Sequence, residues 1–113
     1  MDWKGFIDET NGQLAELRAA APDAMAGFSA LAKAATKPGV LDAKTKEFIA
    51  LGIGIHALCD GCVAFHTKAL VRLGATREEI AETVAMAVYM GGGPALMYGA
   101  KALDAFDAQT GKA

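Results

Sequence analysis

Residues 42–80 read DAKTKEFIALGIGIHALCDGCVAFHTKALVRLGATREEI, and this stretch decides the fold class. Asp42 is a residue type that caps helix N-termini, and the apolar residues after it recur at the helical intervals of three and four. Gly74 is typical of a helix C-terminus. Thr76 and Glu79 then form the T-x-x-E pattern of a capping box. The stretch therefore predicts two helices followed by the start of a third.

The same signals divide the rest of the chain into helices. Pro22 suits the first position of a helix, the Gly91-Gly92-Gly93 run ends one, and Pro94 starts another. Asn11-Gly12 favours a turn and weakens the first helix, and the tail 109–113 is expected to fray. We predict an all-α fold with about six helices in a single domain, residues 1–113. The expected helices cover residues 2–20, 22–36, 43–55, the cysteine segment to 73, 77–90 and 94–107.

Composition supports a helical chain that associates with itself. Alanine accounts for 25 of the 113 residues, whereas valine and isoleucine total ten, which favours helix over strand. The net charge of −2 gives no indication of a nucleic-acid partner. At 53% apolar, so small a domain is expected to meet another copy of itself, as a homo-oligomer. Met86, Met90 and Met97 fit either the core or such a contact.

The chain shows no export or membrane signal. Its N-terminal residues lack the apolar core of a secretory signal, and the longest dense apolar run is residues 48–55. That run is far shorter than the ~20 residues of a membrane span. We therefore predict a cytoplasmic protein with no membrane partner. Its two cysteines, Cys59 and Cys62, form a CxxC pair, which in a reducing compartment is typical of redox activity or metal binding.

Four residues around the CxxC pair indicate chemistry. Cys62 and His66 are four residues apart, so they share one face of a helix. Glu47 lies twelve residues before Cys59, a spacing at which residues of adjacent antiparallel helices can meet. A thiolate attacks peroxides, an imidazole takes the thiol proton, a carboxylate fixes the imidazole, and a second thiol closes a disulfide. We predict Cys62, Cys59, His66 and Glu47 as the catalytic residues.

Two arguments disagree about which sulfur reacts first. The positive end of a helix that begins near the CxxC pair favours Cys59, whereas the one-turn spacing to His66 favours Cys62. We predict that Cys62 attacks peroxide. Asp60, between the cysteines, adds a negative charge, and such a charge raises the pKa of a nearby thiol.

Other interpretations of the same residues stay open. The cysteines fit small core residues, and His56, Cys59, Cys62 and His66 supply the ligand types of a zinc site, although their spacing is unusually tight. A non-catalytic module that senses redox state or holds a metal is therefore one alternative function, and a small-acid decarboxylase is another. Val63 stands where covalent haem attachment needs histidine, and we expect no cofactor.

The pattern E-x11-C-x2-C-x3-H, from Glu47 to His66, resembles the active-site signature of the alkylhydroperoxidase D-like proteins. These proteins belong to the carboxymuconolactone decarboxylase superfamily. Segments 41–47 and 74–80 resemble the family too, so that the likeness covers about residues 38–93. The resemblance implies an all-helical domain that assembles into a ring, commonly a trimer or hexamer. It also implies reduction of alkyl hydroperoxides or disulfides, with a thiol or dithiol protein as the reductant.

The resemblance also implies a role for each residue of the signature. Cys62 would be oxidised to a sulfenic acid, Cys59 would resolve it, and Glu47 and His66 would form the proton relay. The true decarboxylases of the superfamily lack the CxxC pair, which disfavours decarboxylation here. Well-known peroxidase members carry a histidine where this chain has Gly61.

Overall fold

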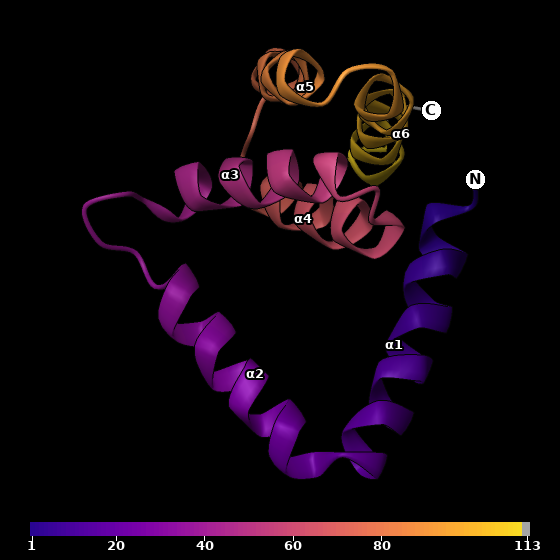
Figure 1. Ribbon diagram of the computed structural model, residues 1–113. Coiled ribbons are helices and arrows are strands. Elements are labelled where there is room, and N and C mark those ends of the chain that lie inside the picture. Colours follow the sequence, from indigo (N-terminus) through magenta and orange to yellow (C-terminus); the bar gives the residue numbers. More distant parts are fainter. Residues whose placement is uncertain (112–113) are drawn as a thin grey trace.

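The computed structural model describes residues 1–111, which form six α-helices and no strand (Figure 1). The helices are α1 (Trp3–Ala20), α2 (Pro22–Thr36), α3 (Ala43–His56), α4 (Asp60–Arg72), α5 (Arg77–Gly91) and α6 (Gly93–Gln109). The predicted all-α class and the predicted number of helices are confirmed. Along this part of the chain, no helix combines the length and the apolar character that crossing a membrane requires.

Helices α3 to α6 form the body of the molecule. Helix α3 lies against α4 and α5, and α6 lies against the same two helices (Figure 1). The core between them consists of fully buried aliphatic side chains, among them Leu51, Ile55, Val63, Leu70 and Ile80. Burial of each large aliphatic side chain stabilises the fold by roughly 1.5–3 kcal/mol. This packing fixes α3 against α4. Glu47 lies on α3, Cys62 and His66 lie on α4, and Cys59 is the N-cap of α4.

The helices of the body begin and end where the sequence signals lie. The Asp42 side chain accepts a hydrogen bond from the Thr45 backbone N–H at 2.7 Å, which caps α3. Thr76 and Glu79 form the predicted capping box, in which each side chain accepts the other's backbone N–H. Gly74 has a φ of +78°, a conformation that favours glycine, so that it ends α4 as expected.

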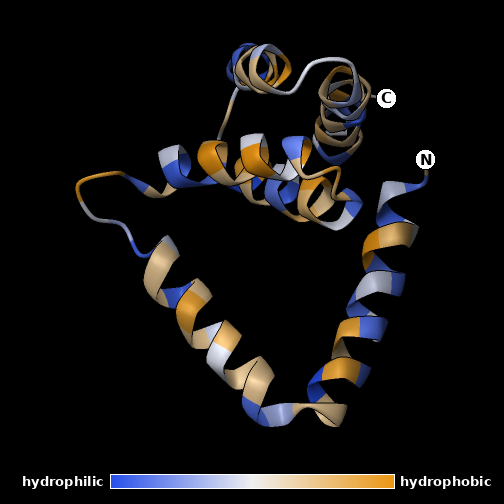
Figure 2. Cartoon of the chain, viewed as in Figure 1, coloured by the Kyte–Doolittle hydropathy of each residue, from blue (hydrophilic) through white to orange (hydrophobic). Residues whose placement is uncertain are grey.

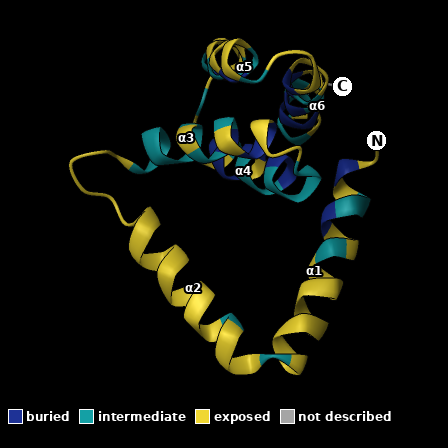
Figure 3. Ribbon diagram, viewed as in Figure 1, coloured by how far each residue is buried: buried dark blue, intermediate teal, exposed yellow. Residues whose placement is uncertain are grey.

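Helices α1 and α2 form a V that stands away from the body (Figure 1). The start of α1 is anchored in the core: Trp3 and Ile7 are buried, and Trp3 Nε1 donates a hydrogen bond to Asp104 Oδ2 of α6 at 2.8 Å. The end of α2 is held by Lys46 of α3, whose Nζ donates to the Ala35 carbonyl at 2.9 Å. From Asn11 to Thr36 almost every residue is exposed, and none of the 15 residues of α2 is buried (Figure 3). We call residues 11–36 the arm. Figure 2 shows that its surface carries many apolar residues.

Some boundaries differ from the prediction. Asn11-Gly12 does not interrupt α1, which continues through both residues to Ala20. The N-terminal half of this helix is anchored by the buried Trp3 and Ile7. The glycine run separates α5 from α6 at Gly92 alone, and α5 and α6 extend one and two residues beyond the expected ends. The expectation of a frayed tail is wrong at Gln109, whose Nε2 donates to Thr67 Oγ1 of α4 at 2.8 Å. The end of that predicted tail, residues 112–113, lies outside the described residues.

Candidate active site

The turn between α3 and α4 places the first cysteine at a helix N-terminus. Leu58 has a φ of +56°, a left-handed conformation that costs an L-residue roughly 1–2 kcal/mol. The next residue, Cys59, donates its backbone N–H to the Gly54 carbonyl at 3.0 Å and becomes the N-cap of α4. The strained turn therefore directs Cys59 to the positive end of the α4 dipole.

The two cysteines form a disulfide across the first turn of α4. Their Cα atoms are 5.2 Å apart, within the usual range for a disulfide. Cys59 Sγ also accepts the backbone N–H of Cys62 at 3.1 Å. Both residues are half-buried, so the pair is neither locked in the core nor fully open to solvent. This hydrogen bond and the helix dipole would stabilise negative charge on Cys59 Sγ after reduction.

Glu47 and His66 meet between α3 and α4. Glu47 Oε2 lies 2.6 Å from His66 Nδ1, and the two side chains are 14% and 32% exposed. A carboxylate at Nδ1 favours the tautomer that carries its proton there, which leaves Nε2 as the basic nitrogen. His66 follows Cys62 by one turn on α4, so this imidazole stands beside the cysteine pair on the same helix.

Gly54 allows α3 to approach the cysteine pair closely. A Cβ atom built at Gly54 would lie 2.7 Å from the Cys62 Cβ, closer than two carbon atoms can pack. Gly52, two residues earlier on the same helix, has open space at the corresponding position. The lack of a side chain at Gly54 is therefore what lets α3 pack closely against Cys62.

One pair of charged residues beside the cysteines was missed by the sequence analysis. Lys101 of α6 places Nζ 3.4 Å from Asp60 Oδ1, and the same ammonium lies 4.5 Å from the Tyr98 ring centroid. Asp60 is the first residue of α4, between the two cysteines. Because Lys101 follows it by 41 residues, no local spacing rule points to this contact.

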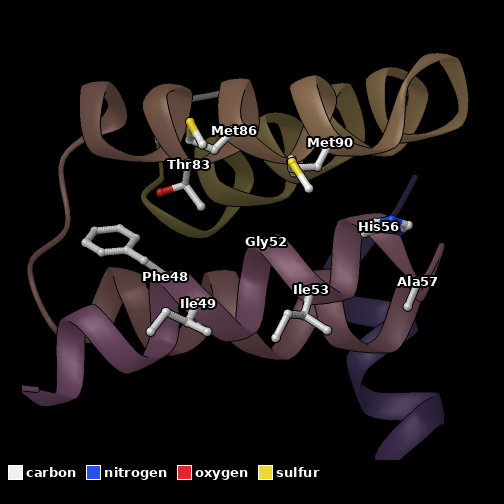
Figure 4. Close-up of a pocket in the computed structure, with 10 residues that line it drawn as sticks. Phe48, Ile49, Gly52, Ile53, His56, Ala57, Thr83, Met86 and Met90 are labelled. Atoms are coloured by element: carbon white, nitrogen blue, oxygen red, sulfur yellow. The ribbon is translucent and has the colours of Figure 1, made fainter.

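The candidate zinc ligands do not come together. His56 lies toward the C-terminal end of α3, beside a cavity between α3 and α5 (Figure 4). Within residues 1–111, no three His, Cys, Asp or Glu side chains are placed to hold one metal ion. The alternative in which His56, Cys59, Cys62 and His66 form a zinc site is therefore not supported by the structure.

The cavity beside His56 is a separate feature from the cysteine site. It has a volume of about 670 Å³ and an almost entirely apolar lining. We call it the α3–α5 groove, and its side chains include Phe48, Ile49, Ile53, Met86 and Met90 (Figure 4). Both methionines are exposed, as is Met97, so the core interpretation of these methionines is wrong and the subunit-contact interpretation stays a prediction.

Comparison with known sequences decides the family. Residues 22–105 match the profile of the carboxymuconolactone decarboxylase family. The chain belongs to this family. The matched residues include both cysteines and the Glu47–His66 pair, and the family resemblance seen in the sequence is confirmed.

Relatives in the carboxymuconolactone decarboxylase family match nearly the whole chain. A family protein from Legionella pneumophila of known structure is 52% identical, with a TM-score of 0.92 and 96% of each chain covered. One from Thermotoga maritima, with a suggested involvement in the antioxidative response, is 28% identical, with a TM-score of 0.81 and 95% and 96% covered. An uncharacterized protein of Cupriavidus necator is 47% identical over 107 residues, 95% of each chain.

Proposed function

We propose that the protein is a thiol-dependent peroxidase and disulfide reductase whose reaction centre is Cys59 and Cys62 with His66 and Glu47. The observation that carries this proposal is the 2.6 Å contact between Glu47 Oε2 and His66 Nδ1, one helical turn from Cys62. A carboxylate, an imidazole and a dithiol in this order supply a proton relay and two electrons. The antioxidative role suggested for the Thermotoga maritima relative agrees with such chemistry.

In the first step, the reduced Cys62 thiol transfers its proton to His66, directly or through a water molecule. The thiolate then attacks the hydroperoxide, the O–O bond breaks, and Cys62 becomes a sulfenic acid. The departing alkoxide takes up the proton and leaves as an alcohol. Glu47 stabilises the imidazolium that exists between these two proton transfers.

In the second step, Cys59 resolves the sulfenic acid. Its thiolate attacks the Cys62 sulfur, the S–O bond breaks, the departing hydroxide takes up the proton that Cys59 lost and leaves as water, and the Cys59–Cys62 disulfide forms. The position of Cys59 at the N-cap of α4, with its sulfur 3.1 Å from the Cys62 nitrogen, favours the thiolate that this attack needs.

In the third step, a dithiol reductant restores both thiols. His66 takes the proton of the reductant's first thiol, the resulting thiolate attacks Cys59, Cys62 leaves as a thiolate, and His66 passes that proton on to Cys62. The second thiol of the reductant then attacks the mixed disulfide, so that Cys59 is released and the reductant carries the new disulfide. The same two electrons thus pass from the reductant to the peroxide.

The test is peroxide consumption with dithiothreitol as the reductant. We expect the wild type to turn over many times and Cys62→Ser to lose turnover. Cys59→Ser, reduced beforehand and then freed of dithiothreitol, should consume one equivalent and stop. Oxidation of the wild type once without turnover would contradict the proposal and favour a redox sensor. Turnover of a small-acid substrate by a variant lacking both cysteines would instead favour a decarboxylase.

The relay is tested separately through Glu47. We expect Glu47→Gln to lower kcat/KM for peroxide by about 100-fold, because general acid–base catalysis contributes about 10²–10⁴-fold. Glu16→Gln, on the exposed part of α1, is the matched control and should leave kcat/KM unchanged. A Glu47→Gln variant with wild-type kcat/KM would remove Glu47 from the mechanism.

A further inference from the structure

A charged pair lies beside the disulfide and takes no part in the proton relay. Asp60, between the two cysteines, places its Oδ1 3.4 Å from Nζ of Lys101. Lys101 belongs to α6, which packs on α4, and it follows Asp60 by 41 residues. The fold therefore brings an ammonium group to the end of α4 that carries both sulfurs.

The Lys101 ammonium is held on a second side by an aromatic ring. It lies 4.5 Å from the ring centroid of Tyr98, which is half-buried and precedes Lys101 by one turn of α6. The face of an aromatic ring attracts a cation. The side chains of Lys101 and Asp60 are 42% and 36% exposed, so solvent screens their attraction less than it screens a fully exposed pair. These contacts keep the ammonium close to Asp60.

The Asp60 carboxylate would by itself oppose ionisation of the neighbouring thiol. Two features favour negative charge on Cys59 after reduction, the α4 dipole and the backbone N–H of Cys62, which lies 3.1 Å from Cys59 Sγ. Asp60 is the next residue, and a nearby like charge disfavours the thiolate. Cys59 is needed as a thiolate twice in the proposed reaction, when it attacks the sulfenic acid and when the reductant releases it.

Both charged residues also have a purely structural explanation. An acidic residue in the first turn of a helix stabilises that helix, and a partly exposed ion pair adds a little more. This explanation predicts that substitutions of the pair change stability and leave the ionisation of Cys59 as it is. Ionisation of Cys59 is therefore the quantity that separates a structural pair from one that serves the reaction.

We propose that Lys101 is a positioning residue that acts through Asp60: its ammonium holds this carboxylate and offsets its charge beside Cys59. The inference rests on the proposed function, because the charge on Cys59 matters for a dithiol that reacts. Lys101 contacts Asp60 and Tyr98, so its influence reaches the sulfur through the carboxylate. No bond forms or breaks at Lys101 in any of the three steps.

The helices packed on α4 carry further ionisable side chains, which stay unchanged in the Lys101 and Asp60 variants. Near the cysteines these are Glu47 and His66, which contact each other, and His56 toward the end of α3. A change that follows substitution of Lys101 or Asp60 therefore reports on that pair. The groups farther away include Asp104 of α6, Lys4 and Asp8 of α1, and Lys68 and Arg72 in the C-terminal half of α4.

The test is the pH dependence of alkylation of Cys59 by iodoacetamide in a Cys62→Ser chain, where a single thiol gives a single midpoint. Iodoacetamide reacts with the thiolate, so the midpoint of the rate profile measures how readily Cys59 ionises. We expect Lys101→Met to raise the midpoint by about half a pH unit, which slows alkylation below the midpoint by about two- to fivefold. Lys101→Arg keeps the charge and should keep the midpoint. Lys68→Met, at an exposed lysine of α4, is the matched control and should keep it too.

Adding Asp60→Asn to Lys101→Met separates an effect through Asp60 from a direct effect on the sulfur. We expect the midpoint to return to that of the parent Cys62→Ser chain, because both charges of the pair are then absent. A midpoint that stays as high as with Lys101→Met alone would overturn the proposal. An unchanged midpoint in Lys101→Met would overturn it as well, and would leave an ion pair that serves stability alone.

Circular dichroism checks that each variant folds. If Lys101→Met does not fold, Asp60→Asn alone decides: we expect its midpoint to fall, because the opposing charge is gone and the lysine stays. An unchanged or raised midpoint in Asp60→Asn would then overturn the proposal. The assay contains no peroxide, so its failure is distinct from a failure of the proposed function, which is measured as peroxide turnover.

Discussion

Helices α2 and α6 have similar compositions but different surroundings. Both carry proline in the first turn, both are rich in alanine, and each has one phenylalanine. Helix α6 buries Ala95, Gly99, Ala102, Ala105 and Phe106 against the body, whereas α2 buries no residue. Helical propensity and apolar content therefore do not decide whether a helix is buried. What decides it is whether the same chain offers a complementary surface.

This difference in burial gives the body and the arm different roles. The body packs tightly enough to hold the Glu47 carboxylate 2.6 Å from the His66 imidazole and to bring Gly54 against Cys62. The arm has no comparable packing within one chain, and its apolar face is available to a second copy. Mutations in the body should therefore affect stability and chemistry, and mutations in the arm should affect association.

The largest expected difference is in core truncations. Ile55→Ala in α3 removes a fully buried side chain, so the free energy of unfolding should fall by about 2–5 kcal/mol. Leu31→Ala in the arm should change the free energy of unfolding of an isolated chain by less than ~0.5 kcal/mol. Urea denaturation at several protein concentrations measures both. If the stability lost in Leu31→Ala rises with protein concentration, Leu31 is buried in an oligomer. Equal losses for Ile55→Ala and Leu31→Ala at low concentration would contradict the difference between body and arm.

A smaller effect is expected from adding one methyl group to α3. Gly54→Ala places its Cβ against Cys62, so we expect a loss of about 1–3 kcal/mol in stability and slower peroxide turnover. Gly52→Ala is the matched control, because it has open space and should gain about 0.5–1 kcal/mol from helix propensity. Denaturation and turnover assays on the two variants separate close approach from helix propensity. A Gly54→Ala variant as stable and active as Gly52→Ala would refute the close approach.

The smallest effect concerns the side-chain N-caps, which α3, α4 and α5 of the body have and which α2, preceded by Ala21, lacks. The pKa of Glu79 is lowered from its ordinary value of 4.5, chiefly by the Thr76 backbone N–H and also by Lys44. A lowered folded-state pKa contributes stability above the unfolded-state pKa, and this contribution is lost as the pH falls through the folded-state value.

We therefore expect Glu79→Gln to flatten the acid limb of the stability profile below about pH 4.5. Thermal unfolding between pH 2 and 7 measures this, with the exposed neighbour variant Glu78→Gln as the control. Thr76→Ala should lower the stability at pH 7 by about 1 kcal/mol. An unchanged acid limb in Glu79→Gln would show that the capping box contributes nothing to the pH dependence.

The sequence predicts the helices because each boundary has a local cause. Asp42, Gly74 and the Thr76–Glu79 box act within one turn of the residues they cap, so their patterns can be read without the fold. The same holds for the one-turn spacing of Cys62 and His66. The contact of Glu47 with His66 needed one further assumption, that α3 and α4 are antiparallel neighbours.

The remaining features depend on distant parts of the chain. Lys101 reaches Asp60 because α6 packs on α4, and Gln109 is held there because α4 offers it acceptors at Thr67 Oγ1 and the Ala64 carbonyl. The exposure of Phe28 was invisible in the sequence, since its helical spacing predicts an apolar face but not what covers it. Tertiary contacts of this kind have no signal in local periodicity.

The most direct test of the central claim is one equivalent of cumene hydroperoxide added to the fully reduced protein, followed by intact mass and peptide mapping. The account predicts that one alcohol forms per chain, that both thiols disappear, and that the mass falls by about 2 Da as Cys59 and Cys62 join. Unchanged thiols, or a stable oxygen adduct on one cysteine with the other still free, would contradict it.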